Sequence, residues 1–250
     1  EFAKLATIFM LAWYLSRIGP RIRKFHYLFL AFAIAGVQSA LIAAQSDMGT
    51  AITYVPVVFV MVFVAGCRKR HLAAIILLGA SLVPLAWMQL EPYQRDRVKT
   101  FVDPTKAPDN EGYQIIQTKI AVGSGEMWGK GVGQGTQTHL RFLPEYRTDF
   151  IFSLLAEERG FVGGVILLAL FAGFLIRGLV LSEECREPAG NLLAAGCVAI
   201  LAFHVFVNVA ITIHLMPITG LPLPFLSYGG SFYLTTMMCV GTMLSVNVRK

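Results

Sequence analysis

The chain has 250 residues, of which 56% are hydrophobic and only 14% are charged, and its mean hydropathy is +0.63. Soluble globular domains carry roughly 25% charged residues, so this composition excludes an ordinary soluble domain and indicates an integral membrane protein. The formal net charge of +6 would suggest nucleic acid in a soluble protein, but here we attribute it to basic loops that set membrane topology.

Seven apolar segments follow one another along the chain, each near the length that crosses a bilayer as a helix, about 20 residues. None alternates with the period of two that membrane β-strands show. The sequence therefore predicts an all-α, polytopic transmembrane bundle that forms one integral membrane domain over residues 1–250. The expected spans are residues 2–16, 27–45, 49–66, 72–90, 161–181, 190–213 and 230–247.

Lys and Arg residues gather in alternate loops of this scheme and predict its orientation. Membrane proteins concentrate these residues on the cytoplasmic side, and the short loops on the opposite side, residues 45–48 and 214–229, contain neither. Residue 1 and the long loop of residues 91–160 are therefore expected on the outer, extracytoplasmic side. The basic residues are Arg17, Arg21, Arg23, Lys24, Arg68, Lys69, Arg70, Arg177, Arg186, Arg249 and Lys250.

The long outer loop has enough sequence pattern to be ordered. Residues 93–104 predict a short helix that Pro104 ends. Residues 112–125 interleave Ile and Val with Gln and Lys, which suits an amphipathic helix in the membrane interface. The glycine-rich residues 123–137 match neither a P-loop nor GxGxxG in a strand–turn–helix setting, so we reject a nucleotide site. Two alternatives stay open for them, a flexible surface loop or a backbone-lined groove against a polar headgroup.

A second irregular segment, residues 214–231, contains Pro217, Pro222 and Pro224. Non-helical backbone at membrane depth must be buried in protein or line a cavity. We expect this segment to fold back over the outer end of the bundle.

Residues 142–158, FLPEYRTDFIFSLLAEE, place Asp149 where the polar loop meets an apolar segment. An acid costs several kcal/mol at bilayer depth unless it is paired or faces water. Asp149 is therefore a candidate for chemistry at the membrane surface, and its alternative role is to cap the helix that follows. We expect the nearby Glu157 and Glu158 to pair with arginines of the same stretch.

Other polar residues lie at or within the apolar segments. Asp47 follows a predicted span, where it either caps the next helix or belongs to a polar cavity. His204 and Asn208 are four residues apart and share one helix face. We expect these two to form hydrogen bonds between helices.

Three stretches in order resemble the SEDS family (shape, elongation, division and sporulation), with the RodA branch as the nearest. They are AAQSDMGTA at 43–51, GYQIIQTKIAVGSGEMWGKGVGQGTQTHLRFLPEYRTDFIFSLLAEERGFVG at 112–163 and FVNVAITIHLMPITGLPLPFLSYGGS at 206–231. The resemblance covers essentially the whole chain. It implies a fragment that lacks the family's amino-terminal spans, in keeping with a sequence that begins at Glu1 without a Met.

The resemblance implies a peptidoglycan glycosyltransferase of the bacterial cytoplasmic membrane. Such a protein polymerises lipid II on the extracytoplasmic face, for cell-shape (elongation) or septal wall synthesis, beside a class B penicillin-binding protein. The family's essential aspartate falls on Asp149. Substrate-binding positions carried over from the family are Lys4, Asp47, Gln117 and Lys119.

The chain departs from the family at two motifs. Ser46 replaces the usual proline before Asp47, and Tyr146 and Arg147 stand where PEQHTDF or PEAHTDF is usual. Arg147 places a permanent cation two residues from Asp149 and would favour its ionised form if the two side chains meet.

The chemistry implied is an inverting displacement, because an α-linked sugar becomes β-1,4-linked. Asp149 would act as general base for the acceptor hydroxyl. Positive charge for the departing pyrophosphate would come from Lys119, Arg141 or Arg147, or from a divalent cation, Mg or Mn. No metal ligands are assigned. The alternatives are a lipid II flippase or transporter, and a non-catalytic scaffold for the penicillin-binding protein.

Overall fold

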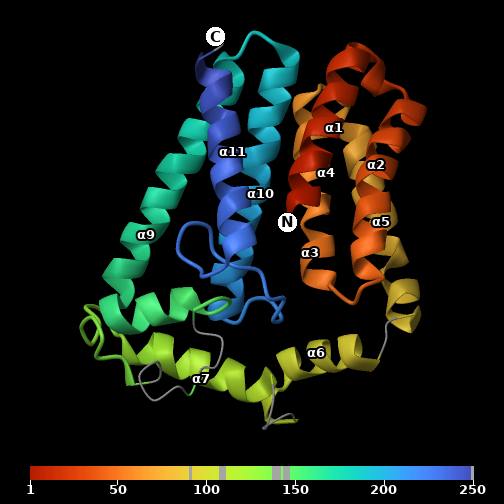
Figure 1. Ribbon diagram of the computed structural model, residues 1–250. Helices are drawn as coiled ribbons and strands as arrows, with labels where there is room; N and C mark the ends of the chain where they lie inside the picture. Colours follow the sequence, from red (N-terminus) through yellow and green to blue (C-terminus); the bar gives the residue numbers. More distant parts are fainter. Residues whose placement is uncertain (90–91, 107–110, 137–141, 143–146, 249–250) are drawn as a thin grey trace. The chain divides into compact units, whose positions relative to one another are not determined.

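The computed structural model describes residues 1–89, 92–106, 111–136, 142 and 147–248 (Figure 1). Within these ranges every regular element is helical, as predicted. The 3-10 helices are η1 (Gly19–Arg23) and η2 (Pro104–Lys106). The α-helices are α1 (Phe2–Ile18), α2 (Phe25–Ala43), α3 (Met48–Ile52), α4 (Tyr54–Val64), α5 (Lys69–Gln89), α6 (Pro92–Val102), α7 (Glu111–Ser124), α9 (Ile151–Glu184), α10 (Pro188–Thr212) and α11 (Gly230–Val248).

All seven apolar segments predicted as spans form helix. The segment of residues 49–66 is divided at Thr53 into α3 and α4. Among the described residues, four helices are long and apolar enough to cross a membrane, namely α2, α9, α10 and α11. The polytopic helical class is therefore confirmed, and the count of seven spans stays a prediction.

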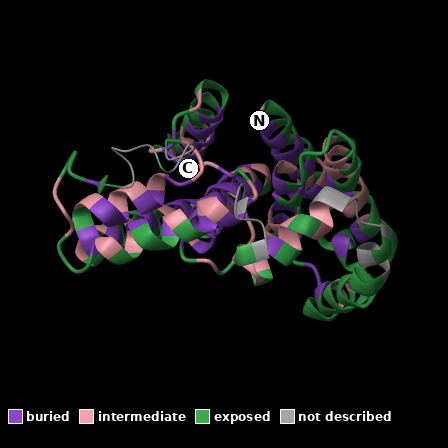
Figure 2. Ribbon diagram, turned by 90° about the horizontal axis from the view of Figure 1, so that it is seen from below, coloured by how far each residue is buried: buried purple, intermediate pink, exposed green. Residues whose placement is uncertain are grey.

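The chain divides into two compact units. The first unit comprises residues 1–83, 173–203 and 230–250, and the second comprises residues 84–172 and 204–229. Most helices carry both buried (purple) and exposed (green) residues in Figure 2. This division of each helix surface is typical of helices that pack on one side and face solvent or lipid on the other.

The core of the first unit forms where α1 and α4 meet the first half of α10. Ile8 and Met61 are fully buried, and a Cβ on Gly196 would lie 2.7 Å from Ile8 Cγ2 and 2.9 Å from Met61 Sδ. In lipid, small residues of this kind let helices approach closely, and van der Waals packing stabilises the contact. Gly196 therefore sets how closely the three helices pack.

In the second unit, α6 and α7 run across the direction of α10 and of the part of α9 that follows Gly160 (Figure 1). Helix α7 buries Ile115, Thr118 and Ala121 and exposes Ile116 and Ile120. The buried positions are three residues apart and lie on one helix face. A helix over this range is therefore confirmed, whereas its predicted place in the membrane interface stays a prediction. Helix α6 matches the predicted short helix, and η2 begins at Pro104.

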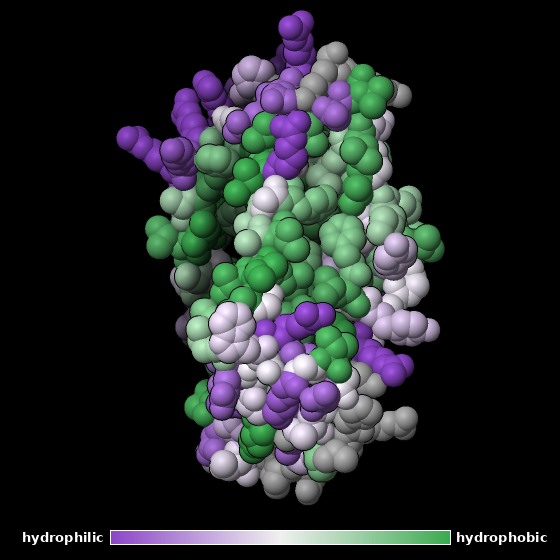
Figure 3. Space-filling view, turned by 90° about the vertical axis from the view of Figure 1, so that its left-hand side faces the viewer, coloured by the Kyte–Doolittle hydropathy of each residue, from purple (hydrophilic) through white to green (hydrophobic). Residues whose placement is uncertain are grey.

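Helix α9 carries a surface of large apolar side chains along its length. In the second unit Phe161, Val165, Ile166 and Leu170 are each at least 47% exposed. Figure 3, which views the side on which α9 lies, shows hydrophobic surface (green) there between hydrophilic groups (purple). A contiguous exposed apolar surface of this kind is expected where a helix faces lipid.

The glycine-rich residues 125–136 form a strap against α9. Helix α9 is interrupted at Gly160, whose φ is 67° and ψ is −167°. The interruption frees two N–H groups, and strap carbonyls accept both: Phe161 N–H donates to Glu126 O (2.8 Å) and Val162 N–H to Met127 O (3.1 Å). In return the strap's Lys130 N–H donates to Glu157 O (3.0 Å). The strap is thus bound to α9 through its backbone, which is not expected of a flexible surface loop.

Glycine is required where the strap and α9 touch. A Cβ on Gly125 would lie 1.9 Å from Ala156 O, and one on Gly129 would lie 2.2 Å from Glu158 O. A Cβ on Gly160 would lie 2.4 Å from Gly129 N, and the positive φ of Gly160 is unfavourable for any other residue. No side chain fits at these three positions without moving the backbone.

Helix α10 ends in a left-handed turn at His214, whose φ is 59°. His214 N–H donates to Ile211 O (3.0 Å) and Leu215 N–H to Ala210 O (2.7 Å), the pattern of a Schellman cap, where Gly is usual. The His214 ring packs on Phe101, with ring centroids 4.8 Å apart. Burial lowers the pKa of His214 below its ordinary value of 6.5, the positive charge of Lys119 lowers this pKa further, and a hydrogen bond to the Phe101 backbone partly offsets both effects.

Replacing Gly160 with Ala is expected to destabilise the protein. The strained backbone alone costs about 1–3 kcal/mol for a residue with a side chain, and the Cβ clash adds to this. The thermal midpoint of the purified full-length protein in detergent measures the effect. Gly123→Ala is the matched control, because a Cβ there meets nothing within 4 Å and Ala favours helix over Gly by about 1 kcal/mol. Equal midpoints for the two variants would contradict the strap packing.

Acidification through the titration of His214 is expected to weaken the second unit. The neutral form is favoured in the folded state, so the stability contribution is present above pH 6.5 and is lost as pH falls toward the lower folded pKa. His214→Asn removes the titration and tolerates the left-handed turn. The thermal midpoint of the Asn variant should therefore fall less between pH 7 and pH 5 than that of the parent. Parallel curves for the two proteins would refute this assignment.

Candidate functional site

Asp149 lies in the turn of residues 147–150 that leads into α9. The helix begins at Ile151, so Phe150 occupies the capping position and Asp149 precedes it by one residue. Asp149 is partly exposed, and a Cβ built on Gly220 would lie 3.5 Å from its Oδ2. The carboxylate therefore lies over Gly220, whose φ of 72° is one that glycine adopts readily.

The backbone of this turn is fixed through three consecutive carbonyls. Tyr228 N–H donates to Arg147 O (2.9 Å), the Ser227 hydroxyl donates to Thr148 O, and Asn208 Nδ2 donates to Asp149 O (2.8 Å). The donors come from the segment after α10 and from α10 itself. The turn is thus held by residues nearly 60 and 80 positions later in the chain.

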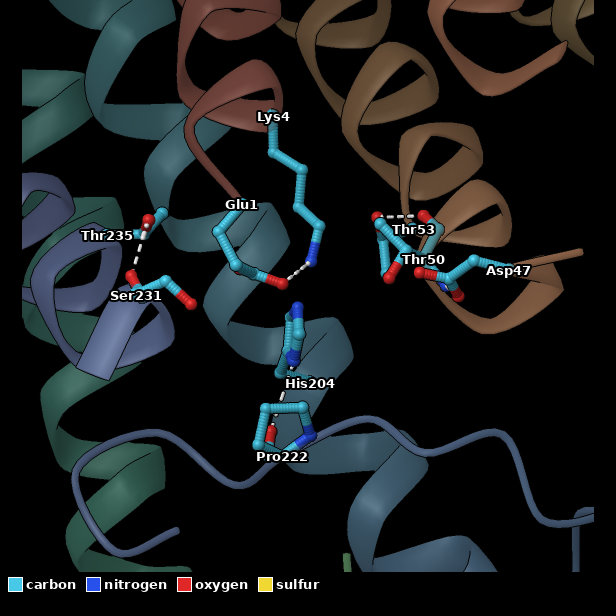
Figure 4. Close-up of polar contacts among 9 residues, drawn as sticks. All are labelled: Glu1, Lys4, Asp47, Thr50, Thr53, His204, Pro222, Ser231 and Thr235. Carbon is cyan, nitrogen blue, oxygen red and sulfur yellow. Dashed lines mark hydrogen bonds and ion pairs between the residues drawn. The ribbon is translucent and has the colours of Figure 1, made fainter. Parts of the chain in front are cut away.

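The segment of residues 214–229 folds back along the end of α10, as predicted. Asn208 Nδ2 also donates to Leu221 O (2.9 Å), and His204 Nδ1 lies 3.1 Å from Pro222 O (Figure 4). Because a carbonyl only accepts, Nδ1 is the protonated ring nitrogen in this contact. His204 and Asn208 thus form hydrogen bonds with carbonyls of the loop and of the Asp149 turn, and the predicted bonds to other helices stay a prediction.

Lys4 and Asp47 belong to the first unit. The Lys4 side chain is 2% exposed, and its Nζ lies 2.7 Å from Glu1 Oε1 (Figure 4). Asp47 is the N-cap of α3, where its Oδ1 accepts from Thr50 N–H at 2.9 Å. The structure thus supports the capping alternative for Asp47, and its role in substrate binding stays a prediction.

The remaining predicted site residues belong to the second unit. Gln117 is half-buried and Lys119 is exposed on α7, and Arg147 is exposed beside Asp149. The pKa of His214 is lowered by burial first and then by the positive charge of Lys119. Arg141 and Tyr146 lie outside the described residues.

The sequence did not predict a partly buried charge pair. Glu157 is fully buried on α9, and its Oε1 lies 2.9 Å from Lys130 Nζ on the strap and 3.2 Å from Thr136 Oγ1. Glu158 Oε1 accepts from Gly133 N–H at 2.9 Å. The pairing of these acids with arginines stays a prediction. The bond to Lys130 could not be predicted, because Lys130 carries no sequence signal that separates it from other loop lysines.

No group of three or more His, Cys, Asp or Glu side chains that could hold a metal ion occurs in the described part of the chain. Magnesium ions, however, often bind through one or two carboxylates together with substrate phosphates and water. No described residue is therefore assigned as a metal ligand, and a divalent cation stays a prediction.

Comparison with known proteins gives the same result over the whole chain. The sequence model of the FtsW, RodA and SpoVE family, described as cell cycle proteins, matches residues 1–250. The chain is 38% identical over 253 residues to peptidoglycan glycosyltransferase MrdB of Escherichia coli K12, covering 100% of this chain and 68% of the relative. It is 39% identical over 248 residues to stage V sporulation protein E of Bacillus subtilis, covering 99% and 67%.

The fold agrees with a solved structure at similar identity. A chain from a study of how a peptidoglycan synthase complex coordinates polymerization and crosslinking aligns with a TM-score of 0.80 and 34% identity, covering 99% of this chain and 69% of that chain. The chain thus spans about two thirds of the length of these relatives, and the similar identities of 38% and 39% do not single out one branch. The chain belongs to the SEDS family of FtsW, RodA and SpoVE proteins.

Proposed function

We propose that this chain is the part of a peptidoglycan glycosyltransferase that carries its catalytic turn. The match to MrdB over the full length of this chain supports the assignment as a glycosyltransferase. The geometry that supports the site is the turn of residues 147–149, because three external donors hold its backbone while Asp149 stays partly exposed. A fixed backbone with an accessible carboxylate is what general-base catalysis needs.

The chain is proposed to span the bacterial cytoplasmic membrane seven times as one integral membrane domain. The distribution of Lys and Arg supports an extracytoplasmic position for residues 91–160. Helix α6, helix α7, the strap and Asp149 would then lie on the outer side. A substrate with a lipid tail would reach Asp149 from the membrane.

The proposed reaction joins sugars of lipid II in a single displacement. Asp149 accepts the proton of the acceptor 4-hydroxyl, and the hydroxyl oxygen forms a bond to the anomeric carbon of the donor. The bond from that carbon to undecaprenyl pyrophosphate breaks as the new one forms, and the electron pair leaves with the pyrophosphate. Attack from the opposite face converts the α link into a β-1,4 link.

The departing pyrophosphate needs positive charge. Lys119 and Arg147 in the described second unit, and Arg141, are the proposed sources; guanidinium groups bind phosphate oxygens in pairs, whereas Lys acts as a point charge. A divalent cation, Mg or Mn, is the other proposed source.

The proposed partner is a class B penicillin-binding protein that crosslinks the glycan product. The synthase complex with a similar chain, in which polymerization and crosslinking are coordinated, supports this pairing. If this chain is instead a non-catalytic scaffold for that partner, Asp149 is dispensable for polymerisation. The reading as a lipid II flippase predicts transport without polymer, and the names of the relatives favour the enzyme.

Asp149→Asn is expected to abolish polymerisation of labelled lipid II by the full-length protein. General-base catalysis contributes about 10²–10⁴-fold to rates, and Asn keeps the size of Asp but cannot accept the proton. Product length on gels measures the effect. Asp96→Asn is the control, since Asp96 is exposed on α6 and pairs with Lys99. Polymer from a correctly folded Asp149→Asn protein at the rate of the control would exclude the base role.

Chelation separates the two sources of positive charge. If a divalent cation supplies it, EDTA stops polymerisation and added Mg²⁺ or Mn²⁺ restores it. If protein cations supply it, polymerisation continues in EDTA and falls in a Lys119→Gln, Arg147→Gln double variant.

A further inference from the structure

We propose that Asn208 is the positioning residue for Asp149, acting through the Asp149 main-chain carbonyl. This inference rests on the proposed function, because it assigns Asn208 a share in the same reaction. Asn208 touches no reacting atom. Its contribution is to fix where the turn presents the carboxylate.

The location of Asn208 makes it the shared anchor of the site. One amide nitrogen donates both to Asp149 O (2.8 Å) and to Leu221 O (2.9 Å). The first acceptor belongs to the residue that carries the carboxylate, and the second immediately follows Gly220, over which that carboxylate lies. A single side chain on α10 therefore holds the Asp149 turn at a fixed distance from the segment around Gly220 and Leu221.

The chemistry of these contacts explains why the residue is an amide. Asn208 is 0% exposed, and both carbonyls that it meets can only accept, so Nδ2 must face them. A hydroxyl has one proton and cannot serve two acceptors at once. The Asn208 Oδ1 atom is buried and has no hydrogen-bond partner among the described residues. An unsatisfied buried acceptor costs about 1–3 kcal/mol. The two bonds donated by Nδ2 are therefore made although Oδ1 stays without a partner among the described residues.

Two neighbours on α10 separate positioning from general support. His204, one turn earlier, contacts Pro222 O and holds the same segment. Thr212, one turn later, donates within the helix to Asn208 O at 2.6 Å. Asn208 is the member of this helix face that reaches the Asp149 turn. Removing the Asn208 amide should therefore lower the catalytic rate more than removing the Thr212 hydroxyl.

The test measures turnover per binding site in full-length Asn208→Ala and Thr212→Val proteins. Titration with labelled lipid II counts the binding-competent sites, and steady-state assays give kcat and KM. A displacement of about 1 Å can cost 10²-fold in rate, so kcat per site should fall about 100-fold in Asn208→Ala while KM stays within about threefold. Thr212→Val should keep the parent values. A purely structural role would lower the number of binding sites and leave kcat per site unchanged.

The outcomes also distinguish this inference from the proposed function. If Asp149→Asn is inactive and Asn208→Ala matches Thr212→Val in kcat per site, only the positioning role is wrong. If Asp149→Asn polymerises normally, the proposed base role fails and the positioning role fails with it. Should Asn208→Ala not fold, Asn208→Ser leaves a smaller cavity and at most one of the two donated bonds, and the same fall in kcat per site is expected.

Discussion

The structure depends on one constraint: irregular backbone that packs against helices must have its buried N–H and C=O groups paired within the protein, since a buried group without a partner is costly. The second unit meets this constraint twice. The strap of residues 125–136 pairs with the N–H groups that the break at Gly160 leaves open in α9. The segment of residues 214–229 is bound to polar side chains of α10. In both places a helix supplies the groups that the loop needs.

The same constraint accounts for the rigidity of the turn that carries Asp149. An ordinary loop would leave its carbonyls to water, but Arg147, Thr148 and Asp149 each have a carbonyl bound by a donor from a distant part of the chain. A preorganised acid or base does not have to reorganise during the reaction, which is the main electrostatic advantage of an enzyme over water. The pair of Lys130 with the buried Glu157 adds a charge-assisted bond between the strap and the helix that Asp149 precedes. Such a pair is costly to break from one side.

The helices could be predicted because hydrophobic length and helical spacing are local properties. The seven apolar segments, α6 and the helix α7 all followed from residues close in sequence. The hydrogen bonds of the site could not be predicted in this way. Asn208 and Asp149 are 59 residues apart, and neither the spacing of His204 and Asn208 nor the glycines of the strap indicated which carbonyls they would meet. Asp47 shows the converse case, since its capping bond to Thr50 is local and was foreseen.

A turn whose main chain is fixed from outside can change its side chains without changing its shape. The bonds from Tyr228, Ser227 and Asn208 end on carbonyl oxygens, which every amino acid provides, so these three bonds place no demand on the side chain at position 147. The arginine there, where the family pattern has histidine, is therefore compatible with the same backbone path. It brings a permanent charge beside Asp149 in place of one that titrates near neutral pH. The charge near the carboxylate can thus change with the side chain at position 147, while Asn208, Ser227 and the backbone of Tyr228 hold the turn that carries Asp149 in place.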